Sequence, residues 1–405
     1  MKAVGLIVEY NPFHNGHALH LAESKKISGA NIVIAAMSGN FLQRGEPALV
    51  SKWTRAKMAL MAGVDIVFEL PYQYATQQAE FFAYGGVSLL QAAGCQTICF
   101  GSESGEIDAF HNTYDFLVKR EADFQAKINQ YMQEGVSYPK ALSMSFQALE
   151  PEANMIDLSQ PNNILGYQYL KAAKMLDQPI QVLTVPRKNA GYHDEHFASK
   201  TIASATSIRS ALFSKNQPEI TEIASYVPNT TYDLLKEYKQ HFGLFHDWER
   251  YWPFLKYKLL SSSPNELRDI YEIEEGIENR LIAHVSEAHS FADFMTQIKT
   301  KRYTWTRLQR ICLHILTNTK KNEMNVADKP VPYLRLLGMT EAGRKYLNKM
   351  KKQLSVPVIS KLSAYNGTEI NLDIRAAKLY NMVLPHNQDQ EYKETPIYIK
   401  QTELT

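Results

Sequence analysis

The sequence predicts an α/β protein built on a parallel sheet, with a mainly helical part after it. Five short runs of β-branched and other apolar residues recur in the first half, each followed by a loop and a helix-compatible segment. The runs are AVGLIV (3–8), NIVIAAM (31–37), DIVFEL (65–70), TICFG (97–101) and IQVLTV (180–185). Apolar strands that alternate with helices are typical of a parallel sheet covered on both faces.

The pattern changes at about residue 226. Stretches rich in Leu, Glu, Lys and Arg follow, with helical spacing, at 231–242, 264–285 and 306–316. Near the end we expect a strand within 356–362, a helix within 370–384 and a loosely structured tail at 393–405. These patterns predict two domains, with residues 1–225 forming the α/β domain and residues 226–405 the mainly helical one.

Composition limits the class of protein. The chain has 405 residues, 45% of them hydrophobic and 21% charged, with a formal net charge of +2. These values indicate a globular chain and argue against bulk coating of nucleic acid, although a local basic patch is compatible with them. We find no cleavable leader pattern, no apolar span of membrane length and no disulfide or zinc spacing among the three cysteines. We therefore expect a cytoplasmic protein without membrane insertion.

The segment NPFHNGH (11–17) stands between the first expected strand and the first expected helix. In open α/β sheets ligands bind beyond the carboxyl ends of the strands, where a phosphate meets free N–H groups and the positive end of a helix dipole. Gly16 lets the backbone approach an anion, Pro12 stiffens the turn, and His14 and His17 are spaced to face one anion. Imidazoles can donate hydrogen bonds to phosphate, and we expect their protonation to be accessible near neutral pH. The alternative is a surface loop whose histidines only cap the helix.

A second motif, IASATSIRSAL (202–212), follows the fifth expected strand and begins a helix with Ser and Thr at its cap. Ser204, Thr206 and Ser207 can offer hydroxyls, and Arg209 several N–H donors, to the same phosphates. The alternative is a capped helix with a solvent-facing Arg. Because both motifs occur in one predicted domain, the phosphate site is favoured.

Together these motifs resemble the two signatures of the nucleotidyltransferase superfamily that includes class I aminoacyl-tRNA synthetases. Longer stretches resemble the bacterial tRNA(Met) cytidine acetate ligase family: GLIVEYNPFHNGHALHL (5–21), MSGNFLQRGEPALVSKWTRAKMALMAGVDIVFELP (37–71), PNNILGYQYLKA (161–172) and RKNAGYHD (187–194). They are spread along the chain, and the resemblance extends over most of it. The resemblance implies a Rossmann-like nucleotidyltransferase domain and a two-step reaction. Acetate and ATP give acetyl-adenylate and pyrophosphate, and the acetyl group then passes to N4 of the wobble cytidine of elongator tRNA(Met).

The resemblance also implies the residues that bind ATP. They are Ile7, Val8, Glu9, Tyr10, Asn11, Pro12, Phe13, His14, Asn15, Gly16, His17, Ala18, Leu19 and His20, with Gly101, Asn162 and Arg187. Acetate is already an anion and needs no general base, so the first step requires positioning and charge stabilisation. We expect His14 and His17 to be catalytic and Ser207 and Arg209 to hold phosphates. Ala205 stands where many members of the superfamily have a serine, which removes one possible donor.

Magnesium is expected with the triphosphate, but we find no acidic cluster dedicated to it and predict no metal site on the protein. Asp65 and Glu69 are expected to order the crevice or the loop beside it. The loop from residue 39 to 55 carries Gln43, Arg44, Glu46, Lys52 and Arg55 and could hold the second substrate or tRNA. A long solvated loop is the alternative.

A folded RNA requires a basic surface near the crevice. The best candidate is the segment 299–321, in which a helix would place Arg307, Arg310 and His314 on one face; the residues proposed to bind tRNA are Arg302, Arg307, Arg310 and Lys320. A solvated helix face would look similar. The segment 343–352 is a second basic stretch, and the acidic segment 272–278 is expected to face elsewhere because it would repel RNA.

Three classes of function remain open at this point. The first is an RNA-modifying ligase that activates acetate. The second is a small-molecule nucleotidyltransferase of coenzyme metabolism, which leaves the helical part without a purpose. The third is a non-catalytic ATP- or RNA-binding protein, which the retained His, Ser, Thr and Arg residues disfavour.

Overall fold

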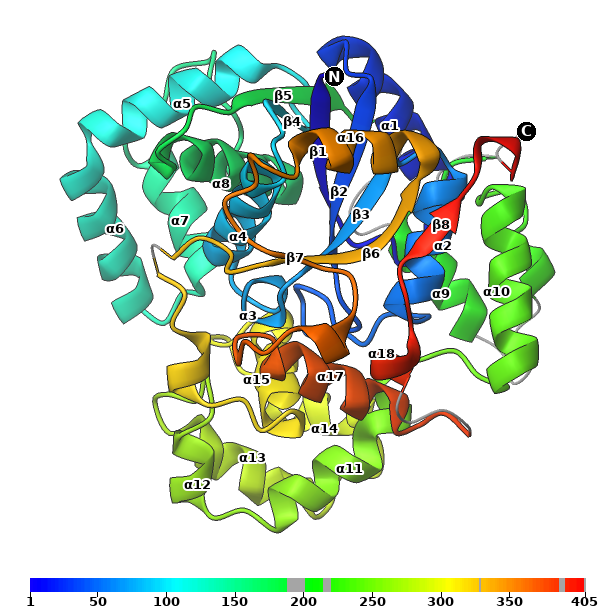
Figure 1. Ribbon diagram of the computed structural model, residues 1–405. Helices are drawn as coiled ribbons and strands as arrows, with labels where there is room; N and C mark the ends of the chain where they lie inside the picture. Colours follow the sequence, from blue (N-terminus) through cyan, green and yellow to red (C-terminus); the bar gives the residue numbers. More distant parts are fainter. Residues whose placement is uncertain (188–200, 214–219, 328, 386–389, 404–405) are drawn as a thin grey trace.

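A mixed β-sheet lies at the centre of the molecule (Figure 1). The structure, a computed structural model, describes residues 1–187, 201–213, 220–327, 329–385 and 390–403. Its strands are β1 (Ala3–Val8), β2 (Ile32–Ser38), β3 (Ile66–Leu70), β4 (Thr97–Ser102), β5 (Gln181–Pro186), β6 (Leu334–Thr340), β7 (Val358–Ile359) and β8 (Ile397–Ile399). The order across the sheet is β5-β4-β1-β2-β3-β6-β7, and β8 also pairs with β6. The five strands predicted from the sequence are all present.

Strands β1 to β5 are parallel, and the order reverses at β1, which pairs with β2 on one side and β4 on the other. In register, Val8 lies opposite Met37 of β2, while Gly5 lies opposite Ile98 of β4. A crevice for a ligand forms at such a switch point, beyond the carboxyl ends of the diverging strands. The end of β1, where NPFHNGH begins, is therefore the expected position of a bound nucleotide.

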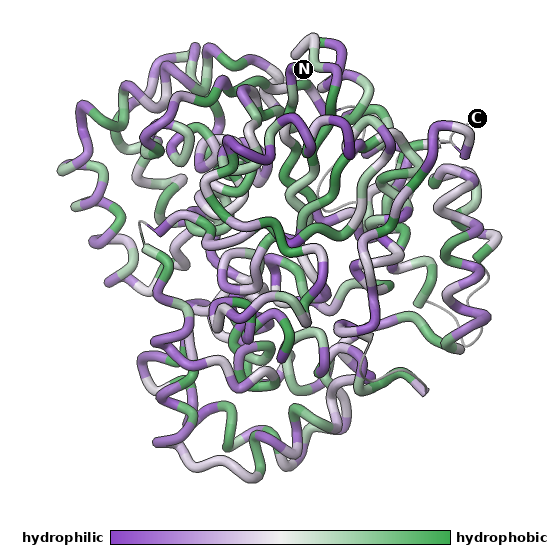
Figure 2. Tube along the Cα trace, in the orientation of Figure 1, coloured by the Kyte–Doolittle hydropathy of each residue, from purple (hydrophilic) through white to green (hydrophobic). Residues whose placement is uncertain are grey.

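Helices cover both faces of the sheet, as the apolar strands require. One face packs against α4 (Ala79–Ala92), α5 (Ile107–Lys119), α7 (Tyr138–Gln147), α8 (Pro161–Met175) and α16 (Glu341–Met350), with α6 (Glu121–Gln133) outside α7. The other face packs against α1 (Asn15–Ser28), α2 (Lys52–Met61), α9 (Ala205–Phe213) and α10 (Asn229–Phe242). Figure 2 shows the central strands as mostly hydrophobic.

A third apolar core belongs to a group of helices below the sheet in Figure 1, next to the turn that follows β3. Its helices are α11 (Trp248–Leu260), α12 (Pro264–Arg268), α13 (Ile277–Val285), α14 (Phe291–Ile298), α15 (Trp305–Leu316) and α17 (Asn371–Asn381). Phe41, from the loop after β2, and Tyr72, the first residue of α3 (Tyr72–Ala75) after β3, are buried in this core. The helical group is thus joined to the end of the sheet where the crevice lies.

The chain after residue 226 is less purely helical than expected. Strand β6 adds antiparallel to β3, and β7 and β8 pair with β6, so the last part of the chain extends the first sheet. Helix α10 packs on α2 over the sheet, which means that the expected boundary at 225/226 does not coincide with a change of layer. Strand β8 and the short α18 (Gln390–Lys393) lie in or beside the tail that was expected to be loose.

The helices predicted at 231–242, 306–316 and 370–384 are present as α10, α15 and α17. The stretch 264–285 is interrupted between α12 and α13. Glu272, Glu275 and Gly276 have φ values of 62°, 60° and 80°, in the left-handed region that ends a helix. The loop between α12 and α13 carries most of the acidic segment 272–278.

Candidate active site

The NPFHNGH segment leaves β1 and turns directly into α1. Tyr10 has a φ of 49°, the Asn11–Pro12 peptide is cis, and His14 takes an extended conformation as the N-cap of α1. The Asn15 side chain donates to the carbonyls of Thr201 and Ser225, at 2.9 and 3.0 Å, and so ties the start of α1 to the chain around α9. Both sequence motifs are thereby brought to one place.

His14 and His17 form a reciprocal cap at the start of α1. His14 Nδ1 accepts from Gly16 N–H at 3.0 Å, and His17 Nδ1 accepts from His14 N–H at 3.3 Å. This is the geometry of a capping box, with histidine in place of the usual glutamate, and the two rings stack with centroids 3.7 Å apart. Because each Nδ1 accepts a backbone N–H, each neutral ring carries its proton on Nε2. Two Nε2–H donors therefore stand side by side at the positive end of α1.

Both imidazoles are neutral at physiological pH. Burial, with the nearby positive charges of Arg187 and Arg209, lowers the pKa of His14 to about 3. Burial also holds the pKa of His17 well below its ordinary value, with His14 and Arg187 adding to the effect. The expectation that protonation is accessible near pH 7 is therefore wrong for the protein without ligand. The pair offers hydrogen bonds to an anion without carrying charge.

Gly16 is required by the position of the His14 ring. A Cβ on Gly16 would lie 2.8 Å from His14 Cε1 and 3.0 Å from its Nδ1. These distances are shorter than van der Waals contact, so any larger residue would displace the imidazole. The sequence suggested that Gly16 leaves room for a phosphate. In the structure the group that lies closest to Gly16 is the His14 ring.

The second motif contributes a cap and an arginine. Ser207 N–H donates to Ser204 Oγ at 3.1 Å, and Ser207 Oγ donates to the Ser204 carbonyl at 3.0 Å, so both hydroxyls help to form the start of α9. Thr206 is exposed. Arg209 points back to the first motif, donating to the Asn11 carbonyl at 3.0 Å and pairing with Glu46 at 3.1 Å. The alternative of a solvent-facing Arg209 is therefore wrong, because only 19% of its side chain is exposed.

Three separate positions suggested by the family resemblance come together on the β4–β5 side. Arg187 Nη1 donates to Asn162 Oδ1 at 3.1 Å. A Cβ on Gly101 would lie 3.3 Å from Arg187 Cγ and 3.7 Å from His20 Cδ2, so glycine leaves room for both side chains. His20 Nε2 is buried, and no partner for it occurs in the described ranges. Of the quoted stretch 187–194, residues 188–194 lie outside the described chain.

Sequence reasoning did not single out Glu103, which holds this group in place. Its carboxylate accepts from Asn162 Nδ2 at 2.6 Å and from Asn163 N–H at 2.8 Å, at the start of α8. The signal in the sequence was an acidic residue directly after β4. The local pattern could not show that this residue contacts the start of α8, which lies much further along the chain. Glu103 therefore orients Asn162, which in turn contacts Arg187.

The loop between β2 and α2 is packed rather than solvated. Trp248 Nε1 donates to the Gly45 carbonyl at 3.0 Å, Gln309 Nε2 to the Arg44 carbonyl at 3.1 Å, and Tyr380 Oη to the Ala48 carbonyl at 2.7 Å. Gly45, at a φ of 77°, lies against the α15 backbone. The solvated-loop alternative is wrong, and the loop is instead fixed between the sheet and the helical group.

Two basic residues of this region point inward. Lys52 is fully buried, with Nζ 2.7 Å from both Glu69 Oε2 and Glu391 Oε1. Arg55 is also buried and donates to the carbonyls of Glu9 and Gly39. They join the loop to β1 and β3, and they are not available to a substrate from solvent.

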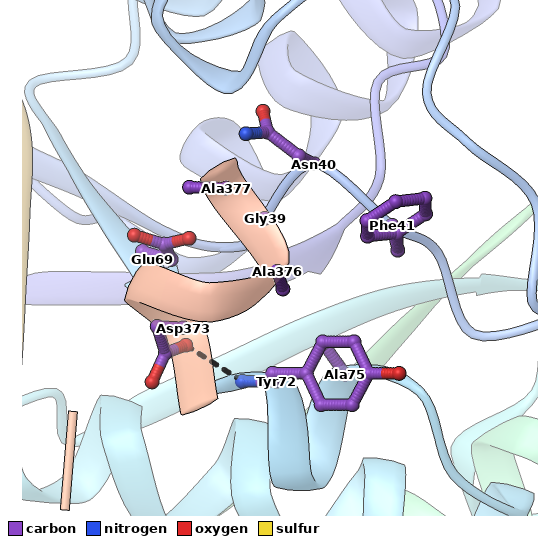
Figure 3. Close-up of a pocket in the computed structure, with 9 residues that line it drawn as sticks. All are labelled: Gly39, Asn40, Phe41, Glu69, Tyr72, Ala75, Asp373, Ala376 and Ala377. Carbon is purple, nitrogen blue, oxygen red and sulfur yellow. Dashed lines mark hydrogen bonds between the residues drawn. The ribbon is translucent and has the colours of Figure 1, made fainter. Parts of the chain in front are cut away.

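Glu69 also borders a recess beside β2 and β3, in which Asp373 accepts from Tyr72 N–H at 2.8 Å (Figure 3). The recess is lined by Gly39, Asn40, Phe41, Glu69, Tyr72, Ala75, Asp373, Ala376 and Ala377. Burial raises the pKa of Glu69 to about 7, against the opposing charge of Lys52. Glu69 thus orders the loop beside the crevice, and Asp373 and Glu391 belong to a charge cluster that no local sequence pattern could assemble.

Asp65, which was expected with Glu69 beside the crevice, lies away from it. It accepts from Val33 N–H at 2.9 Å and from Thr340 Oγ1 at 3.0 Å, at the amino end of β3 and so at the opposite edge from the crevice. Within the described ranges no group of three His, Cys, Asp or Glu side chains is arranged to hold a metal ion.

The basic segment at α15 is largely neutralised by the loop that was expected to face elsewhere. Arg310 is 6% exposed and ion-paired with the buried Glu272 at 2.7 Å, so its guanidinium cannot reach RNA from this position. Arg302 pairs with Glu275 at 2.6 Å and Arg307 with Glu274 at 3.5 Å, both at the surface. The expectation that the acidic segment 272–278 faces away is wrong.

Other parts of the predicted basic surface differ in position. His314 is fully buried, whereas Lys320 is partly exposed at the end of the segment. The second basic stretch forms α16, and Figure 1 places α16 by the N-terminus, at the amino ends of the strands. Of the two stretches, only the one at α15 lies in the helical group next to the crevice end of the sheet.

The fold and the paired motifs are those of HIGH nucleotidyltransferases. A family model described as HIGH Nucleotidyl Transferase matches residues 1–395. The chain is 47% identical over 404 residues to the tRNA(Met) cytidine acetate ligase of Lysinibacillus sphaericus (strain C3-41), covering 98% of this chain and 100% of that one. It is 52% identical over 363 residues to the enzyme of the same name from Geobacillus sp. (strain WCH70), covering 90% of each.

Two solved structures have the same fold as this chain. The apo crystal structure of Thermotoga maritima TmcAL superposes with a TM-score of 0.92 at 30% identity, over 99% of this chain and 100% of that one. The same protein bound to α-thio ATP gives a TM-score of 0.89 at 29% identity, over 99% and 100%. The chain belongs to the tRNA(Met) cytidine acetate ligase family, which confirms the resemblance and the α/β nucleotidyltransferase fold. In the described ranges no helix is both long and apolar enough to cross a membrane.

Proposed function

We propose that this protein is an ATP-dependent ligase that activates acetate as acetyl-adenylate and transfers the acetyl group to N4 of the wobble cytidine of elongator tRNA(Met). The observation that carries the proposal is the meeting of the His14–His17 pair, Arg209 and the Gly101–Asn162–Arg187 group at one crevice. Hydrogen bonds from Arg187 to Asn162 and from Arg209 to the Asn11 carbonyl hold this arrangement, and the similarity to tRNA(Met) cytidine acetate ligases identifies the reaction that it serves.

In the first step an acetate oxygen attacks the α-phosphorus of ATP, a new P–O bond forms, and pyrophosphate leaves. The Nε2–H groups of His14 and His17 donate to phosphate oxygens. The neutral rings already carry these protons, so they can bind the triphosphate without first being protonated. Arg187 and Arg209 supply positive charge near the pair, as their effect on the His14 pKa indicates. Loss of one such donor costs about 3 kcal/mol in the barrier.

Adenosine would lie on the β4–β5 side, where Gly101 leaves space beside Arg187 and His20. Acetate and the cytidine would then approach from the side of the loop between β2 and α2. Ser207 contributes through the cap of α9 rather than by a free hydroxyl. Mg²⁺ would arrive with the triphosphate and be held by phosphate oxygens and water, since the described side chains form no cluster for it.

The tRNA contacts are proposed at Arg302, Arg307 and Lys320, which lie at the accessible part of the α15 segment. Arg310 is left out because its ion pair with Glu272 is buried. Exposed ion pairs are worth at most about 1 kcal/mol, so RNA phosphates can replace the glutamates at Arg302 and Arg307. A cytoplasmic location fits a tRNA substrate.

The test is incubation of purified protein with ATP, Mg²⁺ and labelled acetate, with and without unmodified tRNA(Met). We expect acetate-dependent pyrophosphate release and label in cytidine of the tRNA. Pyrophosphate released only with a small phosphorylated acceptor, and no label in RNA, would favour the alternative of a coenzyme adenylyltransferase.

A further inference from the structure

The two proposed steps differ in their need for a base, and this inference rests on that proposed function. Acetate attacks as an anion and loses no proton. The cytidine N4 amine carries two hydrogens, and one must leave as the amide forms. The leaving AMP is a stable phosphate anion and needs no proton, so the proton must pass to another acceptor. A carboxylate close to the triphosphate repels it and does not help the first step. A carboxylate in this position is therefore explained better by a role in the second step.

Glu9 is the carboxylate at this position. It follows β1 directly and precedes the histidine loop, and Arg55 Nη1 holds its backbone carbonyl at 2.6 Å. One carboxylate oxygen, Oε1, accepts from Gln43 N–H at 2.9 Å. Its side chain is thus turned toward the loop after β2, away from the Gly101–Asn162–Arg187 group on the β4–β5 side of β1.

The neighbouring carboxylates are already occupied. Glu46 is paired with Arg209, Glu69 with Lys52, and Glu103 with the start of α8. Among the carboxylates of the described crevice, Glu9 is the one held only by a backbone N–H, which leaves Oε2 without a hydrogen bond. This oxygen is free to accept a proton from a ligand.

Glu9 also contacts the loop after β2 that the helical group holds in place. The loop that contacts it through Gln43 is fixed by Trp248 at Gly45 and by Gln309 at Arg44. Both side chains come from the helical group, and Gln309 is on α15 itself. A base extruded from the anticodon toward this loop would therefore come close to Glu9.

We propose that Glu9 binds the N4 amine of the target cytidine and is the general base for acetyl transfer. A carboxylate is the side chain that suits the N4–H donor of cytosine. The N4 nitrogen attacks the acetyl carbonyl carbon, a C–N bond forms, and the bond from that carbon to the AMP oxygen breaks. One N4 proton moves to Glu9 Oε2, AMP leaves as the anion, and Glu9 returns the proton to solvent.

The surroundings support a carboxylate that can exchange protons. Burial raises the pKa of Glu9, partly offset by the Gln43 hydrogen bond. The charged and titratable groups that face it are Arg44 and Glu46 of the loop, Arg209 of α9, Arg55 of α2 and Tyr169 of α8. The positive and negative charges of these groups partly offset each other, and burial is the largest cause of the raised pKa.

The test is a pair of single-turnover assays on the full-length protein: acetate-dependent ATP–pyrophosphate exchange and transfer of acetyl to unmodified tRNA(Met). Glu9→Gln keeps an oxygen for Gln43 N–H and removes the base. We expect its transfer to fall about 10²- to 10⁴-fold and its exchange to fall by a factor at least about tenfold smaller, because only the second step uses the base. Transfer by the parent should rise with pH to a plateau, and this dependence should be lost in Glu9→Gln. Glu9→Asp should keep the pH dependence at a lower rate.

Glu80→Gln is the control for charge removal, since Glu80 forms a surface pair with Lys171 away from the crevice, and it should leave both assays unchanged. Transfer by Glu9→Gln at the parental rate would overturn the proposal. Equal loss of exchange and transfer, in a variant with the parental unfolding temperature, would also overturn it and assign Glu9 to the first step or to the metal. Failure of the parent protein to acetylate tRNA would refute the proposed function itself, a result distinct from either.

Discussion

Replacing Gly16 by alanine should separate activity from stability. The added Cβ would lie 2.8 Å from His14 Cε1, so the imidazole must move and give up its hydrogen bond from Gly16 N–H. Loss of an N-cap costs about 1 kcal/mol, and alanine gains about 1 kcal/mol over glycine inside a helix. The two terms nearly cancel, and the free energy of unfolding should change by less than about 1 kcal/mol.

The loss of catalytic rate in Gly16→Ala is not offset in the way that the two contributions to stability are. Displacement of His14 removes one of two aimed donors, which corresponds to about 3 kcal/mol in the barrier, or roughly a hundredfold to a thousandfold in rate. The assay is acetate-dependent ATP–pyrophosphate exchange, run beside denaturant unfolding of the same sample. Exchange at the parental rate in Gly16→Ala would refute the assignment of the His14 ring to the reaction.

Gly29→Ala is the matched control at the other end of the same helix. Gly29 has a φ of 61° and open space around its Cα, so alanine there meets backbone strain and no side chain. It should lower stability by about 1–2 kcal/mol and leave exchange unchanged. The two glycines of α1 are therefore expected to show opposite behaviour.

Three further outcomes are expected. His17→Ala should abolish adenylate formation with unchanged circular dichroism, since it removes an Nε2–H donor; normal turnover in the folded variant would contradict this. Arg307→Ala should weaken tRNA binding and its salt dependence but spare adenylate formation. Arg310→Ala should instead lower stability by about 3–5 kcal/mol, because it leaves the buried Glu272 carboxylate unpaired. Denaturant titration and tRNA binding, measured together, distinguish the two variants. His246 is a second buried imidazole, with its ring nitrogens 2.7 and 2.6 Å from the Tyr238 and Tyr251 hydroxyls. Because burial lowers the folded-state pKa of His14 and His246, their contribution to stability is full above about pH 6.5. It is lost by up to about 1.4 kcal/mol per pH unit for each ring as the pH falls below that value. Unfolding temperatures should fall accordingly from pH 7 to 5, and a flat profile would mean that these rings are not buried in the neutral form.

Much of the first half of the fold is readable from the sequence because its signals are local. Each predicted strand is a continuous apolar run, and the NPFHNGH segment lies at a strand–helix break, so the position of His14 and His17 follows from order along the chain alone. The family resemblance supplied Gly101, Asn162 and Arg187, and the structure shows that they meet.

The errors arise where a tertiary contact overrides a local pattern. The helical spacing of α15 places Arg310 on a polar face, but the loop before α13 covers that face with Glu272. The Lys52 pair with Glu391 joins residues more than 300 positions apart, and spacing carries no information about it. The depressed pKa of His14 likewise depends on burial that a motif cannot show.

The fixed loop between β2 and α2 bears on how the protein matures on the ribosome. Its carbonyls at Arg44, Gly45 and Ala48 receive their donors from Gln309, Trp248 and Tyr380. The histidine segment has its partners once Ser225, whose carbonyl accepts from Asn15, has been made, but this wall of the crevice stays unsupported until residue 380 has emerged. Nascent chains would therefore fold a phosphate-binding end long before they can complete the acceptor side, and the catalytic half is not expected to work when detached from the rest.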